Sequence, residues 1–133
     1  MVLVEEKGGA ILLDALARLD GAWRLDVIGE GPQRAALTDQ ARRLGIADRV
    51  TFAALPSTQM PDFYRRIDTL AVPSLTRPNW KEQFGRVIVE AMACGVPVAG
   101  SSSGAIPDVT GEGGLIVPES DSVALAGALR RLQ

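Results

Sequence analysis

Residues 82–98 read Glu-Gln-Phe-Gly-Arg-Val-Ile-Val-Glu-Ala-Met-Ala-Cys-Gly-Val-Pro-Val. After Gly85 the pattern is helical and almost wholly apolar, and Gly95 suits the end of the helix because glycine readily adopts the left-handed conformation found there. The β-branched run that follows is typical of a buried parallel strand. This stretch therefore predicts a helix that leads into a strand, which is the repeating unit of an α/β fold.

The same alternation recurs along the chain. Segments of helical spacing at 11–19 and 37–44 are followed by Gly21 and Gly45, and Met1–Val4 looks like a strand that is clipped at its start. We predict an α/β protein with a Rossmann-like, three-layer parallel sheet, in which ligands bind beyond the carboxyl ends of the strands. The expected strands are 25–28, 50–53, 69–72, 96–99 and 114–117, and a last helix is expected over 122–133 with Ser120 or Asp121 as its cap.

Composition excludes several function classes. The chain has 133 residues, of which 47% are hydrophobic, and this suffices for one domain with a core. Its formal charge of -2 provides no broad basic field for a nucleic-acid duplex or an anionic membrane. The absence of His excludes Ser-His-Asp triads and His-ligated zinc within this chain. The single cysteine, Cys94, and the lack of a leader or membrane-spanning run make a cytoplasmic location the expectation.

Glu90 is the one acid within the apolar helix. An unpaired carboxylate in apolar surroundings is costly, so a strong partner such as a bound polyol is expected. The backbone N–H groups of residues 83–87 would point out of the helix N-terminus, where the helix dipole favours a diphosphate. Glu82 precedes Glu90 by eight residues, about 12 Å if the segment is helical throughout. The alternatives are a solvent-exposed or internally paired Glu90, and a Glu82 that only stabilises the start of the helix.

With these motifs the chain resembles the C-terminal, donor-binding half of a GT-B glycosyltransferase of the family 4 type. The signal is the Glu-x7-Glu pair formed by Glu82 and Glu90 in its Phe-Gly and Glu-Ala-Met-Ala-Cys-Gly-Val-Pro-Val setting. The resemblance covers nearly the whole chain, from Lys7 to Pro118. It implies a single nucleotide-sugar-binding domain over residues 1–133, with the N-terminal acceptor domain absent.

The resemblance also implies a reaction, the retaining transfer of a sugar from a nucleoside diphosphate donor without a cofactor or an obligatory metal. Glu82 would bind the hydroxyls of the donor sugar, and Lys7 would neutralise the diphosphate as the leaving group forms. Glu90 would bind the ribose diol, and the loop 54–60 would line the base. The remaining donor-binding residues implied by the resemblance are Gln83, Phe84, Gly85, Arg86 and Val87.

Two departures from the family pattern affect this interpretation. Family members usually carry an Arg a few residues before the lysine, whereas the matching position here is near Val2. The acceptor domain, which could bring the enzyme to the periphery of the inner membrane, is also missing, so this segment alone is expected to be inactive. One alternative is a non-catalytic nucleotide-sugar-binding or regulatory module that pairs with a separate chain. Another is a hydrolase that uses Glu82 and Glu90 as acid and nucleophile, which requires carboxylates about 5–10 Å apart.

Overall fold

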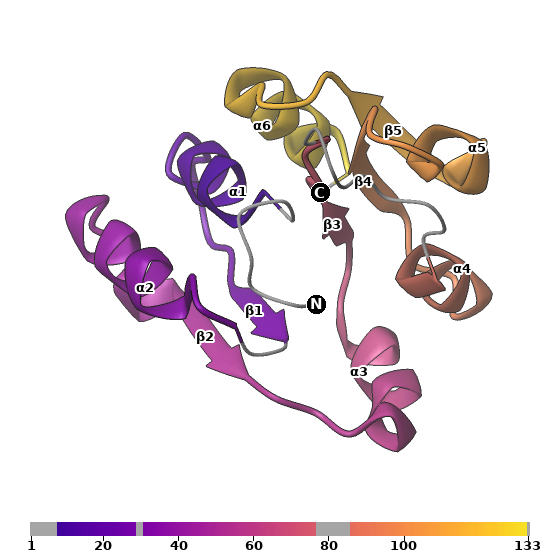
Figure 1. The fold of residues 1–133 in the computed structure, drawn as a ribbon, viewed down its shortest axis with the longest axis horizontal. Helices are drawn as coiled ribbons and strands as arrows, with labels where there is room; N and C mark the ends of the chain where they lie inside the picture. Colours follow the sequence, from indigo (N-terminus) through magenta and orange to yellow (C-terminus); the bar gives the residue numbers. More distant parts are fainter. Residues whose placement is uncertain (1–7, 29–30, 77–85, 133) are drawn as a thin grey trace.

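The computed structural model describes residues 8–28, 31–76 and 86–132, and in these ranges helices alternate with strands (Figure 1). The strands are β1 (Leu25–Ile28), β2 (Val50–Ala53), β3 (Leu70–Val72), β4 (Val98–Ser101) and β5 (Gly114–Val117). The α-helices are α1 (Gly9–Leu16), α2 (Arg34–Arg43), α3 (Met60–Arg66), α4 (Arg86–Ala93), α5 (Ile106–Thr110) and α6 (Ser122–Arg131). Two short 3-10 helices, Ala47–Arg49 and Ser57–Gln59, precede β2 and α3.

Helices cover both faces of the strands. Leu12 of α1 packs in one buried cluster with Leu125 of α6, and Leu37 of α2 joins a second cluster that also contains α1 residues. On the opposite face α3 contributes Phe63 to a third cluster, while Ile88 of α4 packs with α5 in a fourth. The layers are therefore α1, α2 and α6 on one face and α3, α4 and α5 on the other, which confirms the predicted three-layer Rossmann-like architecture (Figure 1).

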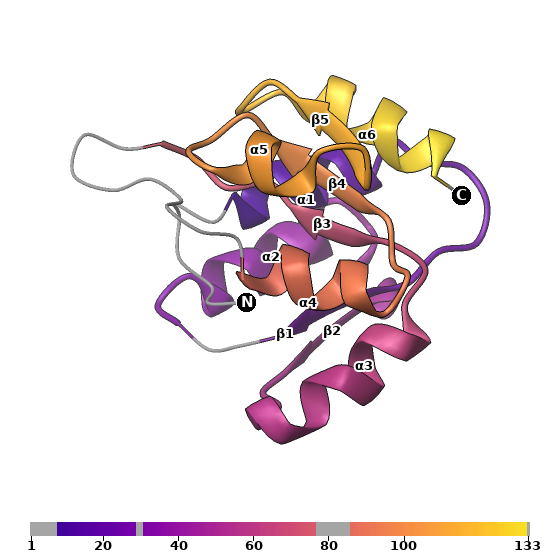
Figure 2. The same ribbon diagram turned by 90° about the vertical axis from the view of Figure 1, so that its right-hand side faces the viewer.

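The strand layer consists of two parallel sheets. One pairs β1 with β2 and sets Leu25 beside Val50, and the other has the order β3-β4-β5 and sets Val98 beside Gly114. Within the described residues no strand pairing joins β1 to β3. Figure 2 shows that the strands of both sheets run in the same direction, so that their carboxyl ends lie on one side of the molecule. The loops that follow the strands therefore share one edge.

The ends of the helices explain where β4 begins. At the C-terminus of α4, Gly95 adopts a φ of 77° and its N–H donates to the carbonyl of Met92, while the Val96 N–H donates to the carbonyl of Ala91, each at 3.0 Å. This Schellman arrangement uses Val96 in the helix cap, and Pro97 has no N–H to donate to a ladder. β4 thus begins at Val98, two residues later than the start predicted for the strand 96–99.

Of the two glycines predicted to end the first two helical segments, Gly45 directly follows Leu44, the C-cap of α2, whereas α1 ends at Leu16 and Gly21 lies four residues beyond its C-cap Ala17. Gly21 and Gly45 have φ values of 85° and 75°, in the left-handed region. The predicted cap of the last helix is resolved in favour of Asp121, whose carboxylate accepts a hydrogen bond from the Ala124 N–H at 2.8 Å. The expected strand positions are otherwise confirmed at β1, β2 and β5, and β3 starts one residue later than expected.

Candidate functional site

The N-terminus of α4 opens at the carboxyl edge of the sheet. α4 begins at Arg86, and Glu90 follows about one helical turn later. The first backbone N–H groups of a helix have no partner inside it and carry a partial positive charge. The described part of the predicted site thus combines donors that suit an anion with a carboxylate one turn away.

Glu90 lies at the boundary between core and surface. Its neighbours Ile88 and Ala91 are fully buried, whereas Glu90 itself is half-buried. Among the residues that the structure describes, its carboxylate has no hydrogen bond or ion pair. The carboxylate is therefore neither in bulk solvent nor paired with a described cation, and its oxygens remain available to a ligand.

Tyr64 of α3 faces this carboxylate. Burial, then the negative charge of Glu90, and then Cys94 raise the pKa of the Tyr64 phenol to about 12. The Tyr64 side chain is buried, and its hydroxyl has no hydrogen-bond partner among the described residues. Cys94 packs against the cluster that contains Tyr64 and is half-buried.

A tight turn brings the start of α1 to the loop after β3. Gly8 is the N-cap of α1 and has a φ of 73°. A Cβ on Gly8 would lie 1.8 Å from the carbonyl oxygen of Pro73, so no larger residue fits this position. Two loops that the sequence places at the ligand edge, before α1 and after β3, therefore meet here.

Thr76 connects the loops that follow β3, β4 and β5. Its backbone N–H donates to Glu119 Oε1, and its hydroxyl donates to Glu119 Oε2 at 2.9 Å. The Ser103 hydroxyl lies 2.8 Å from the Thr76 hydroxyl, and the Ser101 hydroxyl donates to the carbonyl of Ser74 at 2.6 Å. These bonds fix the chain at Thr76. Glu119 was not among the residues predicted for the site, although its position just after the strand 114–117 places it at the ligand edge.

Several predicted site residues lie outside the described ranges, namely Lys7, Glu82, Gln83, Phe84 and Gly85. Of the others, α4 carries Arg86, Val87 and Glu90 together, and Val87 packs against the cluster of Ile88. In the described part of the chain no group of three Cys, Asp or Glu side chains could hold a metal ion. The described helices are all too short or too polar to cross a membrane.

Comparison with known proteins decides the family. A family model described as glycosyl transferases group 1 matches residues 1–133, the full chain. The chain belongs to this family. Among similar proteins, the 2-deoxystreptamine N-acetyl-D-glucosaminyltransferase of Streptomyces fradiae is 37% identical over 77% of this chain. The GDP-mannose-dependent alpha-(1-6)-phosphatidylinositol monomannoside mannosyltransferase of Mycolicibacterium smegmatis is 35% identical over 96% of it. The chain spans 24% and 35% of the length of these two relatives.

Solved structures of another protein share the fold. The Anabaena protein HepE in complex with UDP superposes with a TM-score of 0.87 and 30% identity, over 98% of this chain and 36% of HepE. HepE in complex with UDP-glucose gives a TM-score of 0.86 and 31% identity over the same shares of the two chains. Together with the family match, these neighbours identify the fold as the C-terminal domain of a GT-B glycosyltransferase.

Proposed function

We propose that this group 1 chain is the donor-binding half of a retaining glycosyltransferase that uses a nucleoside diphosphate sugar. In this reaction the bond between the anomeric carbon and the diphosphate breaks, and an acceptor hydroxyl bonds to the same carbon with its configuration kept. The nucleoside diphosphate leaves. The similar HepE structures contain UDP or UDP-glucose, which supports a donor of this chemical class.

The roles of the site residues follow from where charge develops on the donor during the transfer. Negative charge develops on the diphosphate as it leaves. Lys7 and the backbone N–H groups at the start of α4 would stabilise this charge. Glu82 would bind the hydroxyls of the donor sugar. Gln83, Phe84 and Gly85 would contribute to the binding of the sugar and diphosphate. No resident metal is needed in this scheme.

The observation that carries the proposal is the position of the Glu90 carboxylate and its lack of a described partner. This carboxylate is half-buried, lies one turn from the N-terminus of α4 and has no described hydrogen-bond or ion-pair partner. A diol can donate two hydrogen bonds to a carboxylate, and hydrogen bonds to a charged group are worth about 1.5–3 kcal/mol each. We infer that Glu90 binds the ribose diol while the helix N-terminus binds the diphosphate.

Calorimetric titration with UDP-, GDP- and ADP-sugars tests the proposal. We expect one donor class to bind, and Glu90→Ala to weaken that binding by about 10- to 100-fold because at least one charged hydrogen bond is lost. Glu112→Ala is the matched control, since Glu112 is exposed in the turn before β5. Binding by none of the donors, or equal binding by the Glu90→Ala variant, would contradict the proposal.

The same proposal includes the place where the acceptor binds. We assign it to an N-terminal domain or a partner chain, because relatives of this family are about three to four times as long as the part that matches. A cytoplasmic reaction, with contact to the inner membrane made through that domain, agrees with the unpaired Cys94. Adding a purified acceptor domain should produce turnover, whereas donor binding without turnover in its presence would favour a non-catalytic module.

A further inference from the structure

The charged side chains are not evenly spread over the fold. Because all strands run in one direction and the helices return between them, the helices end and the strands begin at the same edge, opposite the N-terminus of α4 (Figure 2). We call this region the arginine edge. It consists of the last two residues of every α-helix and of the segments 17–24, 44–49, 67–69, 94–97 and 111–113 that lead into the strands, all of which the structure describes.

The arginine edge is strongly positive, although the whole chain has a formal charge of -2. It carries nine arginines against four acids, a net charge of +5, while the rest of the sequence carries five basic residues against twelve acids. The expected lack of a basic field therefore holds for the total charge but not for this edge. The nine arginines are Arg42 and Arg43 in α2, Arg65 and Arg66 in α3, Arg130 and Arg131 in α6, and Arg18, Arg24 and Arg49 between a helix and the next strand; the acids are Asp20, Asp48, Asp68 and Glu112.

Most of these guanidinium groups have no carboxylate partner. Eight of the nine arginines are exposed and Arg49 is half-buried. Among the described residues their ion pairs are Arg42 with Asp39 at 3.4 Å and Arg65 with Asp62 at 2.8 Å, each on the exposed surface of one helix. Exposed pairs of this kind contribute little. The edge thus keeps nearly all of its positive charge for an external anion.

Helix dipoles account for only part of this pattern. A helix C-terminus carries about half of one negative charge. By contrast α2, α3 and α6 each end in two adjacent arginines, and the other three arginines lie outside the α-helices. The positive charge is therefore several times larger than the helix ends require.

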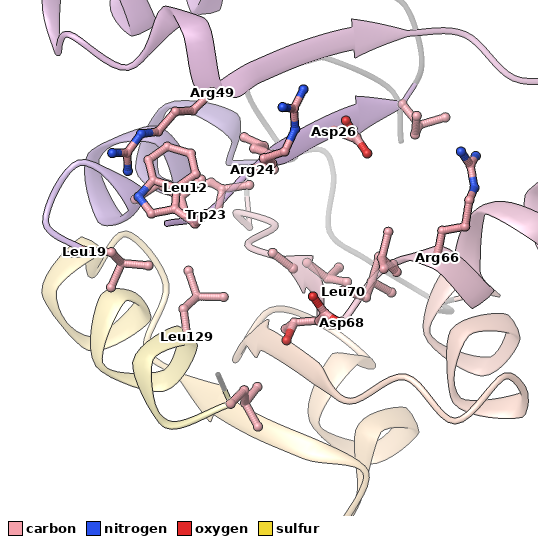
Figure 3. Close-up of a pocket in the computed structure, with 18 of the residues that line it drawn as sticks. Leu12, Leu19, Trp23, Arg24, Asp26, Arg49, Arg66, Asp68, Leu70 and Leu129 are labelled. Atoms are coloured by element: carbon pink, nitrogen blue, oxygen red, sulfur yellow. The ribbon is translucent and has the colours of Figure 1, made fainter. Parts of the chain in front are cut away.

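The acids elsewhere in the chain do not cancel this field. A four-residue strand spans about 13 Å, whereas salt screens charges beyond about 8 Å at physiological ionic strength. The arginines also extend across both sheets, since Figure 3 shows Arg49 and Arg66 on opposite sides of the pocket between the sheets, which Arg24 also lines. An anionic surface would therefore meet a wide positive field and not a single strip of charge.

The composition of the arginine edge favours one kind of anionic partner. Binding of single-stranded nucleic acid relies on free aromatic faces, but the one aromatic residue here, Trp23, packs against two buried clusters and has the Arg49 guanidinium 5.1 Å from its ring centroid. A protein interface has an apolar core with few charges, whereas the one large apolar side chain exposed at this edge is Leu44. A bilayer needs neither feature, because its phosphates attract basic residues directly.

We infer that the arginine edge is a docking surface for the anionic headgroups of a phospholipid bilayer. The planar guanidinium donates two parallel hydrogen bonds to one phosphate, and every basic residue at this edge is an arginine. Docked in this way, the domain directs the N-terminus of α4 away from the bilayer, where a dissolved ligand can reach it. The inference concerns the edge opposite the donor site and does not rest on nucleotide binding.

Sedimentation with vesicles tests the inference. The chain should bind vesicles of phosphatidylcholine with about 30% phosphatidylglycerol at low salt, and should not bind phosphatidylcholine alone. Binding should fall by about 10-fold or more in about 0.5 M salt, where charges are screened within a few ångströms.

The matched variants reverse one arginine at each end of α2. Arg43→Glu removes two net charges from the arginine edge and should weaken binding about 10-fold or more. Arg34→Glu makes the same change at the exposed start of the helix and should leave binding within about 3-fold of the parent. Arg131→Glu repeats the test on α6, and thermal unfolding checks that each variant is folded.

Several outcomes would overturn the inference. One is the absence of binding to the anionic vesicles at low salt, and another is equal binding to the neutral ones. An equal loss in Arg43→Glu and Arg34→Glu would show that total charge, not the arginine edge, decides the binding. If polyglutamate or single-stranded polyuridylate bound more tightly than the anionic vesicles at the same salt, the edge would belong to a polypeptide or nucleic-acid partner.

Discussion

Glu119 and Thr76, from the loops after β5 and β3, are joined by two hydrogen bonds, one from the backbone N–H and one from the hydroxyl of Thr76. The pair fixes the chain at the point where it leaves β3 for the segment 77–85, which carries the predicted catalytic Glu82. On the far side of that segment the chain re-enters regular structure at Arg86. We therefore expect Glu119 to act as a positioning residue through the backbone of Thr76.

Replacing Glu119 with Ala should therefore affect both stability and donor binding. Hydrogen bonds to a charged acceptor are worth more than neutral ones, and for this half-buried carboxylate we expect a loss of about 1–2 kcal/mol in the free energy of unfolding. Donor affinity should fall several-fold because Thr76 no longer holds the start of the segment. Denaturant titration and calorimetry measure the two effects. A Glu119→Ala variant that behaves like Glu112→Ala in both assays would show that the pair has no positioning role.

Gly8→Ala should be among the most damaging single substitutions. The φ of 73° is strained for alanine, and the added Cβ would overlap the Pro73 carbonyl oxygen. We expect a loss of about 3 kcal/mol or more, the sum of the left-handed strain and the displaced backbone. Gly21→Ala is a matched control, because its φ is 85° but no atom lies within 4 Å of the added Cβ. Equal losses for the two variants would mean that the contact with Pro73 is not tight in solution.

The stability of the chain should depend on pH in the alkaline range through Tyr64. In the unfolded chain this phenol titrates near its ordinary pKa of 10.0, whereas in the folded chain the pKa is about 12. Stability is thus complete below pH 10 and falls as the pH rises from 10 towards 12, because the unfolded state loses its proton first.

Ultraviolet titration of the phenolate checks this directly, since Tyr64 is the only tyrosine in the sequence. Tyr64→Phe should remove the Tyr64 contribution to the alkaline loss. At neutral pH the variant should be as stable as the parent or more so, because it removes a buried hydroxyl without a described partner. A folded-state titration centred on pH 10 would contradict the assigned surroundings of Tyr64.

Asp121→Ala should destabilise α6 by about 1 kcal/mol, the usual effect of losing an N-cap oxygen. Asp121→Asn keeps the oxygen that accepts from the Ala124 N–H and should restore most of the loss. Thermal unfolding of the three proteins measures the difference. If the Asn variant were as unstable as the Ala variant, the contribution of Asp121 would come from its charge and not from the cap.

Local elements were predictable from the sequence because their determinants are local. The apolar runs at 25–28 and 114–117 mark strands, and Gly45 follows the end of α2 because it tolerates positive φ, whereas α1 ends at Leu16, well before Gly21. The predicted start of β4 was wrong by two residues, and the reason for this difference is also local. Val96 can serve as a strand residue or as part of a helix cap, and the pattern alone does not distinguish the two uses.

The contacts between distant loops were less predictable. Thr76 and Glu119 lie 43 residues apart, and nothing in either stretch indicates the other. The motif that surrounds Glu90 predicted a carboxylate in apolar surroundings that needs a strong partner, but its proximity to Tyr64 depends on how α3 packs on α4. Such contacts depend on how the layers pack on one another. The sequence pattern predicts the fold class but not the packing of particular helices and loops.

Within the described residues no strand pairing joins the two sheets, which are linked mainly by side-chain packing and by the hydrogen bond from the Arg130 guanidinium to the carbonyl of Arg18, while each sheet is held internally by a ladder of backbone hydrogen bonds. Apolar contacts have no preferred direction, whereas a ladder sets a register. Among the described elements, the boundary between the two sheets is consequently held by no main-chain ladder, so local opening there would break the fewest of the backbone hydrogen bonds that these elements make.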